Sequence, residues 1–244
     1  MAERYYTEEL TTIPFKTMRR SMAAMIPGPL AFGVAAYFRL RGLLRWPLPP
    51  TYATGDVGSE RVVAWESLPA RALSRWAPLI EQFRDLHFRP LKYSIGDTIG
   101  VKQQAAAVFL DAAGTTLATL EWIRMRGADG ITEQSPFEFN SYAAEDPELM
   151  TGVVEDSARA MADLLKIAFV DAVLVSNRLT VAAAYRQHLT RIEGRPVFCL
   201  ASEAALQEHE RRRARRFAWA VQAGLLRWLS TAEVARVRKL VLPA

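Results

Sequence analysis

The sequence predicts an α+β protein: a predominantly antiparallel sheet covered by helices, with an apolar N-terminal segment and a long arginine-rich C-terminal helix. Three observations support this fold class. Four β-like segments follow one another between residues 100 and 156 and are joined by short turns such as "AAG" and "GADG", which is typical of an antiparallel meander. Residues 21–38 carry no charge, and five arginines lie between residues 211 and 216.

Size and composition limit the organisation of the chain. It has 244 residues, half of them hydrophobic, and a net charge of +5, which predicts a folded protein with a sizeable core. We expect an N-terminal arm and apolar segment over residues 1–50, an α+β domain over 51–201, and C-terminal helices over 202–244. A single cysteine excludes an intrachain disulfide.

The uncharged run "SMAAMIPGPLAFGVAAYF", residues 21–38, has basic residues on both sides. Eighteen residues of helix would span about 27 Å, just short of a hydrocarbon core of about 30 Å. Pro27 and Pro29 interrupt the run, so an unbroken helix is expected to start only near Pro29 or Leu30. This pattern favours an interfacial or re-entrant helix over a plain membrane span.

Six residues of this region are expected to contact a membrane or a partner protein: Phe32, Phe38, Arg39, Arg41, Arg45 and Trp46. Arginine heads can reach lipid phosphates, and tryptophan favours the headgroup level. A buried or surface helix of a soluble protein and a cleaved secretory signal are the alternatives. Residues 1–20 show no clear periodicity and are expected to form an arm.

Three prolines in "WPLPPTY" predict a linker after this segment. The stretch "RVVAWES" predicts a short strand. Residues 68–86 predict a helix with four core residues on one stripe: Leu73, Trp76, Ile80 and Phe83.

The middle of the chain predicts four strands. The segments "GVKQQAAAVFLD" and "TTLATLEWIRMR" form a hairpin through Gly114, and "ITEQSPFEFNSY" and "LMTGVVED" follow. We expect helices on one face of this sheet. The carboxylates Glu145, Asp146 and Glu148 are interpreted as turn residues, and "SIGDTIG" as a loop between strands.

Beyond residue 157 the pattern is mixed. Residues 158–176 fit either a continuous helix or a helix that changes to a strand near Ile167. Asn177 or Thr180 is expected to cap a helix that stops at Gly194. The stretch "PVFCLAS" predicts a buried strand, with Cys199 as a packed, inert thiol.

Ser202 is expected to cap a long helix that reaches about Leu229, and "STAE" (residues 230–233) predicts a capping box for a last short helix. The arginines of the long helix are candidates for contact with an anionic surface: Arg211, Arg212, Arg213, Arg215 and Arg216. The alternative is a solvated helix whose apolar half packs on the domain. Neighbouring Glu208 and Glu210, and the lack of a recognised binding motif, argue against nucleic acid.

Residues that could carry catalysis are few. The sequence has no HExxH, GxSxG or CxxC motif. One hypothesis takes His188 as a general base, Arg186 or Arg178 as an anion clamp and Asp171 as the group that orients the base. A core histidine is the favoured interpretation of His188, because it lies on an apolar helical stripe.

These patterns favour a non-catalytic, membrane-associated binding or interaction protein of a bacterial-type cell, attached through residues 21–46 with its main domain in the cytoplasm. An enzyme for a small anionic substrate near His188, and a soluble cytoplasmic subunit that docks on a protein partner through the same N-terminal segment, are the alternatives. With three histidines and one cysteine, we expect no metal and no cofactor.

Overall fold

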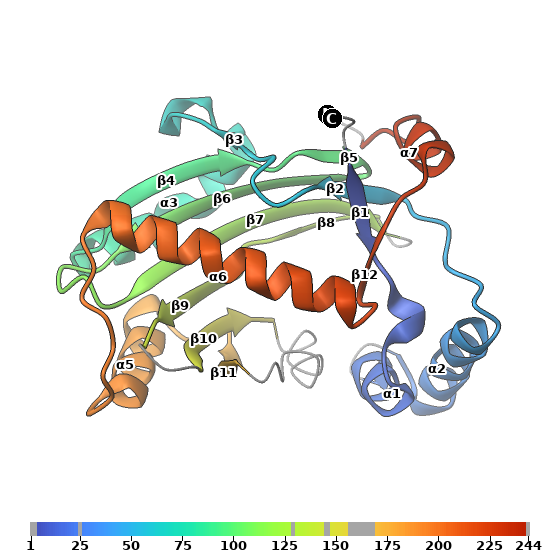
Figure 1. The fold of residues 1–244 in the computed structure, drawn as a ribbon, viewed down its shortest axis with the longest axis horizontal. Helices are drawn as coiled ribbons and strands as arrows, with labels where there is room; N and C mark the ends of the chain where they lie inside the picture. Colours follow the sequence, from blue (N-terminus) through green and yellow to red (C-terminus); the bar gives the residue numbers. More distant parts are fainter. Residues whose placement is uncertain (1–3, 24–25, 128–129, 144–146, 156–168, 243–244) are drawn as a thin grey trace.

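The computed structural model describes residues 4–23, 26–127, 130–143, 147–155 and 169–242, which form two β-sheets with helices packed around them (Figure 1). The larger sheet contains β3 (Arg61–Val62), β4 (Arg89–Ile95), β6 (Lys102–Leu110), β7 (Leu117–Gly127), β8 (Gly130–Gln134), β9 (Phe137–Ser141), β10 (Glu148–Val154) and β11 (Val170–Ser176). The smaller sheet contains β1 (Tyr5–Glu8), β2 (Tyr52–Gly55), β5 (Thr98–Gly100) and β12 (Leu226–Trp228). The helices are α1 (Phe15–Ala23), α2 (Gly28–Leu43), α3 (Ala70–Asp85), α5 (Val181–Ile192), α6 (Ser202–Gln222) and α7 (Thr231–Val237).

The larger sheet runs in the order β11-β10-β9-β7-β6-β4-β3, and β8 also pairs with β7. All its pairings are antiparallel except that of β10 with β11. The predicted α+β class with a largely antiparallel sheet is therefore confirmed. Glu145, Asp146 and residues 158–168 of the ambiguous segment lie outside the described residues.

The β6–β7 hairpin forms where the sequence predicts it. Gly114 has a φ of +72°, a conformation that glycine adopts without a Cβ penalty. Asp111 is buried, and its carboxylate accepts hydrogen bonds from the backbone N–H groups of Thr115 and Thr116 at 2.8 and 3.0 Å. The turn is therefore held both by backbone conformation and by a side chain.

Helices cover both faces of the larger sheet, which corrects the expectation of one covered face. Ala105, Ala107 and Phe109 of β6 pack with α3 and α5. Val108 and Leu110 of the same strand pack on the opposite side, with Ala205 of α6. Figure 1 shows α6 crossing the strands on that second face. Side chains alternate across a strand, so both sets need cover.

The principal core lies between the sheet and α3. Trp76 and Phe83 of α3 are fully buried, and the ring of Phe83 stacks on that of Phe109 with the centroids 5.2 Å apart. Leu73 and Ile80 are partly buried against the same cluster. The predicted apolar stripe of this helix is thus the core-facing one.

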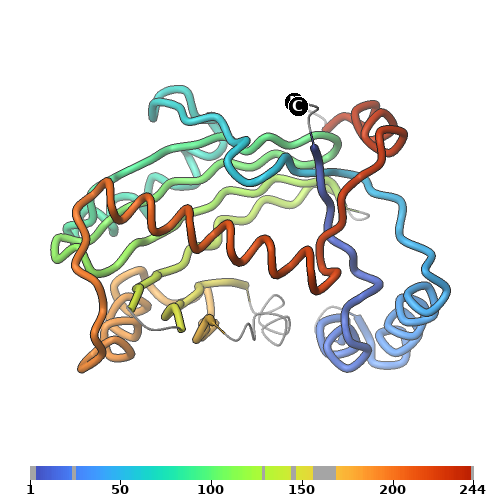
Figure 2. Tube along the Cα trace, viewed as in Figure 1, coloured from blue at the N-terminus to red at the C-terminus, as the bar shows by residue number. Residues whose placement is uncertain are grey.

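The two ends of the chain meet in the smaller sheet. β1 lies between β2 and β12 and pairs antiparallel with both, and Figure 2 shows the blue and red segments side by side. The expectation of an irregular N-terminal arm is therefore wrong for residues 5–8. The long helix also ends at Gln222 rather than near Leu229, because Gly224 (φ +72°) turns the chain into β12.

The stretch "PVFCLAS" does not form the predicted buried strand. Only Val197 makes a bridge, to Ala143, and Cys199 is exposed, with its Sγ donating to the carbonyl of Ala113 at 3.0 Å. This segment connects α5 to α6, which lie on opposite faces of the sheet, and it passes the ends of the strands at the β6–β7 turn, where Leu200 N–H donates to the carbonyl of Gly114 at 2.8 Å. Its apolar composition reflects contacts such as that of Leu200 with the core beneath α6.

Candidate functional site

Helices α1 and α2, which we call the hairpin, pack on each other at one end of the molecule, apart from the larger sheet (Figures 1 and 2). Their contact buries Ile13, Met18 and Ala35. Gly42 fits closely against the backbone of Thr11, so that a side chain at this position would collide with it. Thr12 donates through Oγ1 to the carbonyl of Gly224 at 2.9 Å. The hairpin is thus fixed to the end of α6.

The outer side of α2 and the residues after it form an exposed apolar surface. Its seven members are each more than half exposed: Leu30, Phe32, Tyr37, Leu40, Leu43, Leu44 and Trp46. Four of them, Leu30, Tyr37, Leu40 and Leu44, recur at helical spacing along one line of α2. Several large apolar side chains exposed on one short segment are typical of a site that contacts a membrane or another protein.

The charged residues of the hairpin and its flanking segments are all basic. Between Glu9 and Asp56 the sequence contains no acidic residue and six basic ones: Lys16, Arg19, Arg20, Arg39, Arg41 and Arg45. All of these except Arg41 are exposed. Lys16, Arg19 and Arg20 are exposed on α1, and Arg39 and Arg45 are exposed on α2 and just after it, so both helices of the hairpin present basic groups to solvent.

The residues predicted to contact a membrane or partner divide into two groups. Phe32, Arg39, Arg45 and Trp46 are exposed. Phe38 instead packs toward α1. Arg41 is nearly buried, and its guanidinium donates to the Tyr37 hydroxyl at 2.7 Å and to the carbonyls of Trp46 and Pro47 at 3.0 and 2.8 Å. Arg41 therefore fixes the end of α2 rather than facing outward.

Among the described residues, no helix combines the length and the apolar character that a transmembrane span requires. The 16 residues of α2 correspond to about 24 Å of helix.

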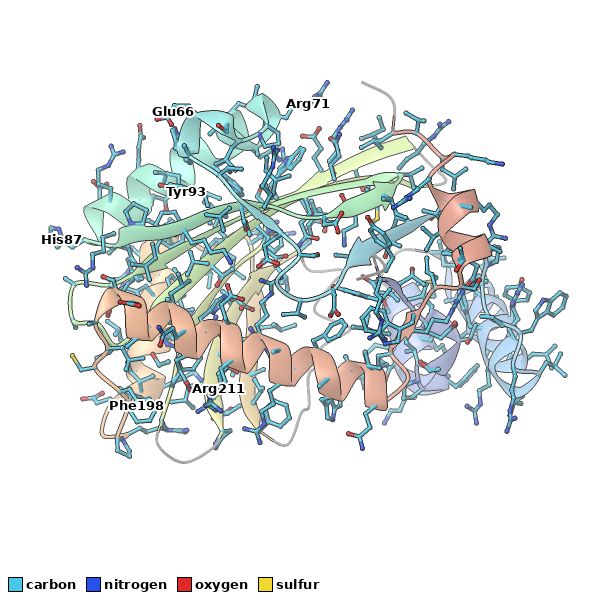
Figure 3. All side chains as sticks on the ribbon, turned by 45° about the horizontal axis from the view of Figure 1, so that its top comes forward. Glu66, Arg71, His87, Tyr93, Phe198 and Arg211 are labelled. Carbon is cyan, nitrogen blue, oxygen red and sulfur yellow. The ribbon has the colours of Figure 1, made fainter. Side chains whose placement is uncertain are left out.

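The arginines of α6 do not form one exposed basic surface that could contact an anionic partner. Arg211 is more than half exposed and lies on the outer side of the helix (Figure 3). Arg215 is also exposed and lies over the ring of Phe169. Arg212 is buried, and its Nε donates to Glu208 at 2.8 Å. Arg213 forms an ion pair with Glu60. Part of the arginine cluster therefore covers the polar face of the sheet.

Arg216 and its neighbours form a buried charged group under α6. The Nη1 atom of Arg216 lies 3.6 Å from Glu138 and 3.7 Å from Glu148. Glu148 is fully buried, and burial, reinforced by Glu138 against the attraction of Arg216, raises its pKa to about 7. His209 is buried and hydrogen-bonded through Nδ1 to the Tyr142 hydroxyl at 3.0 Å. Burial lowers the pKa of His209 to about 4.

His188 is fully buried and lies between two hydroxyl groups. Its Nδ1 is 3.0 Å from Thr151 Oγ1, and its Nε2 is 3.0 Å from Ser141 Oγ. Arg191 donates to Thr151 Oγ1, and Ser141 Oγ donates to the carbonyl of Thr115. Thr151 can therefore donate to Nδ1 while Nε2–H donates to Ser141. This assigns the neutral Nε2–H tautomer and occupies both ring nitrogens.

The residues of the enzyme hypothesis do not converge. Asp171 accepts from Arg191 at 2.9 Å and from Arg195 at 3.3 Å, so it orients arginines and not His188. Arg186 is exposed on α5. A cavity of about 560 Å³ lies at the start of α5 and is lined by Arg178, but His188 does not line it. A general base must reach the proton that it removes, and His188 has no exposed surface.

Helical spacing and the prolines make α2 recognisable in the sequence. The roles of Arg41 and Arg191 could not be recognised there, because their hydrogen-bond partners are backbone carbonyls and residues of other strands. Comparisons of the chain with protein-family models, with curated proteins and with solved structures found no match.

Proposed function

We propose that this protein binds the surface of an anionic membrane through the α1–α2 hairpin and is a non-catalytic binding or interaction protein. The observation that carries the proposal is the exposed apolar surface of seven residues on a segment that has basic but no acidic residues.

The apolar surface supplies one part of the binding free energy. Fully burying a large apolar side chain is worth roughly 1.5–3 kcal/mol, so partial insertion of several such side chains is worth several kcal/mol. Leu40 and Leu44 lie one turn apart on the exposed side of α2, and Trp46 follows the helix end. Tryptophan is favoured at the headgroup level of a bilayer. An interfacial helix needs this arrangement, with one face on the protein and the other in lipid.

The basic residues supply the other part. Each lysine or arginine near an anionic leaflet is worth about 1 kcal/mol. Lys16 and Arg19 are exposed on α1, and Arg39 and Arg45 flank the apolar surface. Because acidic residues are missing between Glu9 and Asp56, this attraction is not offset within the segment.

The hairpin is held in position without lipid. Gly42 of α2 packs on the backbone of Thr11, just before α1, and the neighbouring Thr12 donates to the carbonyl of Gly224 after α6, so these contacts fix the hairpin to the body of the protein. Binding therefore needs little ordering of the chain, which reduces its entropic cost.

The test is co-sedimentation of the full-length protein with vesicles. We expect binding to phosphatidylcholine vesicles that contain phosphatidylglycerol, weaker binding to phosphatidylcholine alone, and weakening by salt. The double variant Leu40→Ser/Leu44→Ser tests the apolar part, and Lys16→Gln/Arg19→Gln tests the electrostatic part. Each is expected to lower the affinity about tenfold or more, and only the second should reduce the salt dependence.

Matched controls use exposed residues elsewhere. Val62→Ser removes an exposed apolar side chain from β3, and Arg84→Gln/Arg186→Gln removes two exposed charges from α3 and α5. Both are expected to bind as the unmodified protein does. If the protein stays in the supernatant with every vesicle, the proposal is overturned, and a protein partner becomes the occupant to seek for this surface. Point variants are preferable to a chain that starts at Thr51, because that truncation removes β1 from the smaller sheet.

A further inference from the structure

A cavity of about 240 Å³ lies between α6 and the polar face of the larger sheet. Strands β4, β6, β7 and β9 contribute to its wall, and α6 closes it. The polar groups that matter here are Ser94, Gln104, Thr119, Glu121, Glu138 and His209. Neither His188 nor any of the exposed residues of the hairpin lines the cavity.

When the acidic and basic residues that line the cavity are paired, one carboxyl group has no basic partner. Four are acidic (Glu60, Glu121, Glu138 and Glu210) and three are basic (Lys92, Arg213 and Arg216), so the wall has a formal net charge of −1 when all four carboxyl groups are ionised. Lys92 and Arg213 each pair with Glu60 and Glu210, and Arg216 pairs with Glu138. Glu121 is the remaining member, and within the described part of the chain it forms neither an ion pair nor a side-chain hydrogen bond. Burial, reinforced by Glu138, raises the pKa of its carboxyl group, so its ionised form lacks a compensating cation.

A second polar group at the cavity also lacks a partner. Thr119 is 93% buried, and its Oγ1 has no hydrogen-bond partner among the described residues. A buried hydroxyl without a partner costs about 1–3 kcal/mol. Thr119 and Glu121 are alternate residues of β7, so both project toward the α6 side of the sheet. The cavity therefore presents an unpaired carboxylate and an unpaired hydroxyl from one strand.

The paired charges of the wall are fixed. Burial alone would raise the pKa of Glu60, but hydrogen bonds from Arg213 and Lys92 outweigh it and lower that pKa to about 2. His209 is neutral at pH 7, because burial lowers its pKa to about 4. His209 therefore carries no charge that could neutralise Glu121, and Lys92 and Arg213 are engaged with Glu60.

We propose that this cavity binds a small organic monocation, an ammonium group that pairs with Glu121 and carries a further polar group that hydrogen-bonds to Thr119. Charge decides the sign of the ligand, because the wall lacks one positive charge and an anion would meet the unpaired carboxylate. A cavity of this volume, about eight times the volume of one water molecule, suits a ligand the size of an amino alcohol. This site is independent of the membrane surface proposed for the hairpin.

The probe for the test is ethanolamine, with ethylene glycol as the neutral comparison. Titration calorimetry and thermal unfolding of the full-length protein are expected to show binding of ethanolamine and none of ethylene glycol. Glu121→Gln is expected to weaken ethanolamine binding at least tenfold. The matched control, Glu81→Gln on the exposed side of α3, is expected to leave binding unchanged.

Thr119→Val separates a ligand role from a structural one. Valine has nearly the same shape but no hydroxyl, so removal of an unpartnered buried polar atom is expected to maintain or raise the Tm of the free protein. Ethanolamine binding is expected to weaken severalfold in the same variant. This variant also carries the test if Glu121→Gln does not fold. The proposal is overturned if ethanolamine does not bind, or if both variants bind it as well as the unmodified protein does.

Discussion

Arg216 on α6 holds its Nη1 atom 3.7 Å from Oε1 of Glu148 on β10, a fully buried carboxyl group that accepts no hydrogen bond in the described part of the chain. This pair joins the arginine-rich helix to the polar face of the sheet. Burial raises the pKa of Glu148 more than the attraction of Arg216 lowers it, so the ion pair does not keep this carboxyl group ionised below about pH 7.

Glu148 is expected to make stability fall as the pH rises. Its pKa is about 7 in the folded protein and near 4.5 when exposed, so the folded state binds the proton more tightly between these values. The free energy of unfolding therefore decreases from about pH 4.5 to about pH 7 and is constant above that.

The Glu148→Gln variant removes this contribution. The difference in free energy of unfolding between the variant and the unmodified protein is expected to shift in favour of the variant by up to about 3 kcal/mol when the pH rises from 5 to 8. Urea unfolding at the two pH values measures the change, with the exposed Glu81→Gln as control. Equal pH dependence in the Glu148 variant and the unmodified protein would contradict this assignment.

His188 is expected to act in the opposite direction. Burial, together with the nearby Arg191, lowers its pKa to about 3, whereas the unfolded value is near 6.5. The unfolded state therefore binds the proton first, and stability is lost as the pH falls below about 6.5.

Replacing His188 by glutamine is expected to destabilise the protein at pH 7 by about 1–3 kcal/mol, because the hydrogen bonds to Ser141 and Thr151 are disturbed. From pH 7 to pH 5 the unmodified protein loses stability through protonation of His188 in the unfolded state, and the variant does not. The difference in free energy of unfolding between the two should therefore shrink by about 2 kcal/mol. His87→Asn, at an exposed position, serves as control. A deficit that stays constant with pH would show that His188 does not titrate in this way.

Arg41 is expected to hold the chain where α2 ends. Its three hydrogen bonds reach Tyr37, Trp46 and Pro47. In Arg41→Gln, hydrogen exchange at Arg45 and Trp46 is expected to become about tenfold faster or more, as loss of these bonds costs roughly 1–3 kcal/mol locally. Arg39→Gln, which changes an exposed arginine of the same helix, should leave these rates unaltered. Similar exchange in both variants would refute the structural role of Arg41.

Cys199 is expected to react with a thiol reagent in the folded protein, because its side chain is exposed. Labelling with Ellman's reagent without denaturant should reach one thiol per chain, and Cys199→Ser should give none. A reaction that starts only after unfolding would restore the interpretation of a packed thiol.

Local sequence patterns predicted several elements well. The stripe of Trp76 and Phe83 identified α3, the break at Pro27 and Pro29 placed the start of α2 within two residues, and the capping box of Ser230 and Glu233 is formed. Each of these signals depends on contacts within a few residues along the chain. Such contacts are encoded directly in the order of the residues.

Strands that pair across long separations were harder to predict. The residues of β1 carry no clear alternation, and they become a strand because β2 and β12 offer hydrogen-bond partners on both sides. The apolar neighbours of Cys199 predict a buried strand, but the segment passes the ends of the strands at the β6–β7 turn. Tertiary context overrides local composition in both cases.

The sequence by itself determined that this is a folded α+β chain with an apolar, basic segment near its start, since composition and periodicity are properties of consecutive residues. Only the tertiary structure decided which side chains face outward. It turned Arg41, Arg212 and Arg216 toward the protein while leaving Leu40, Leu44 and Trp46 uncovered. The physical reason is that burial depends on which distant elements pack against a residue, and a linear pattern shows which residues share a face but not what covers that face.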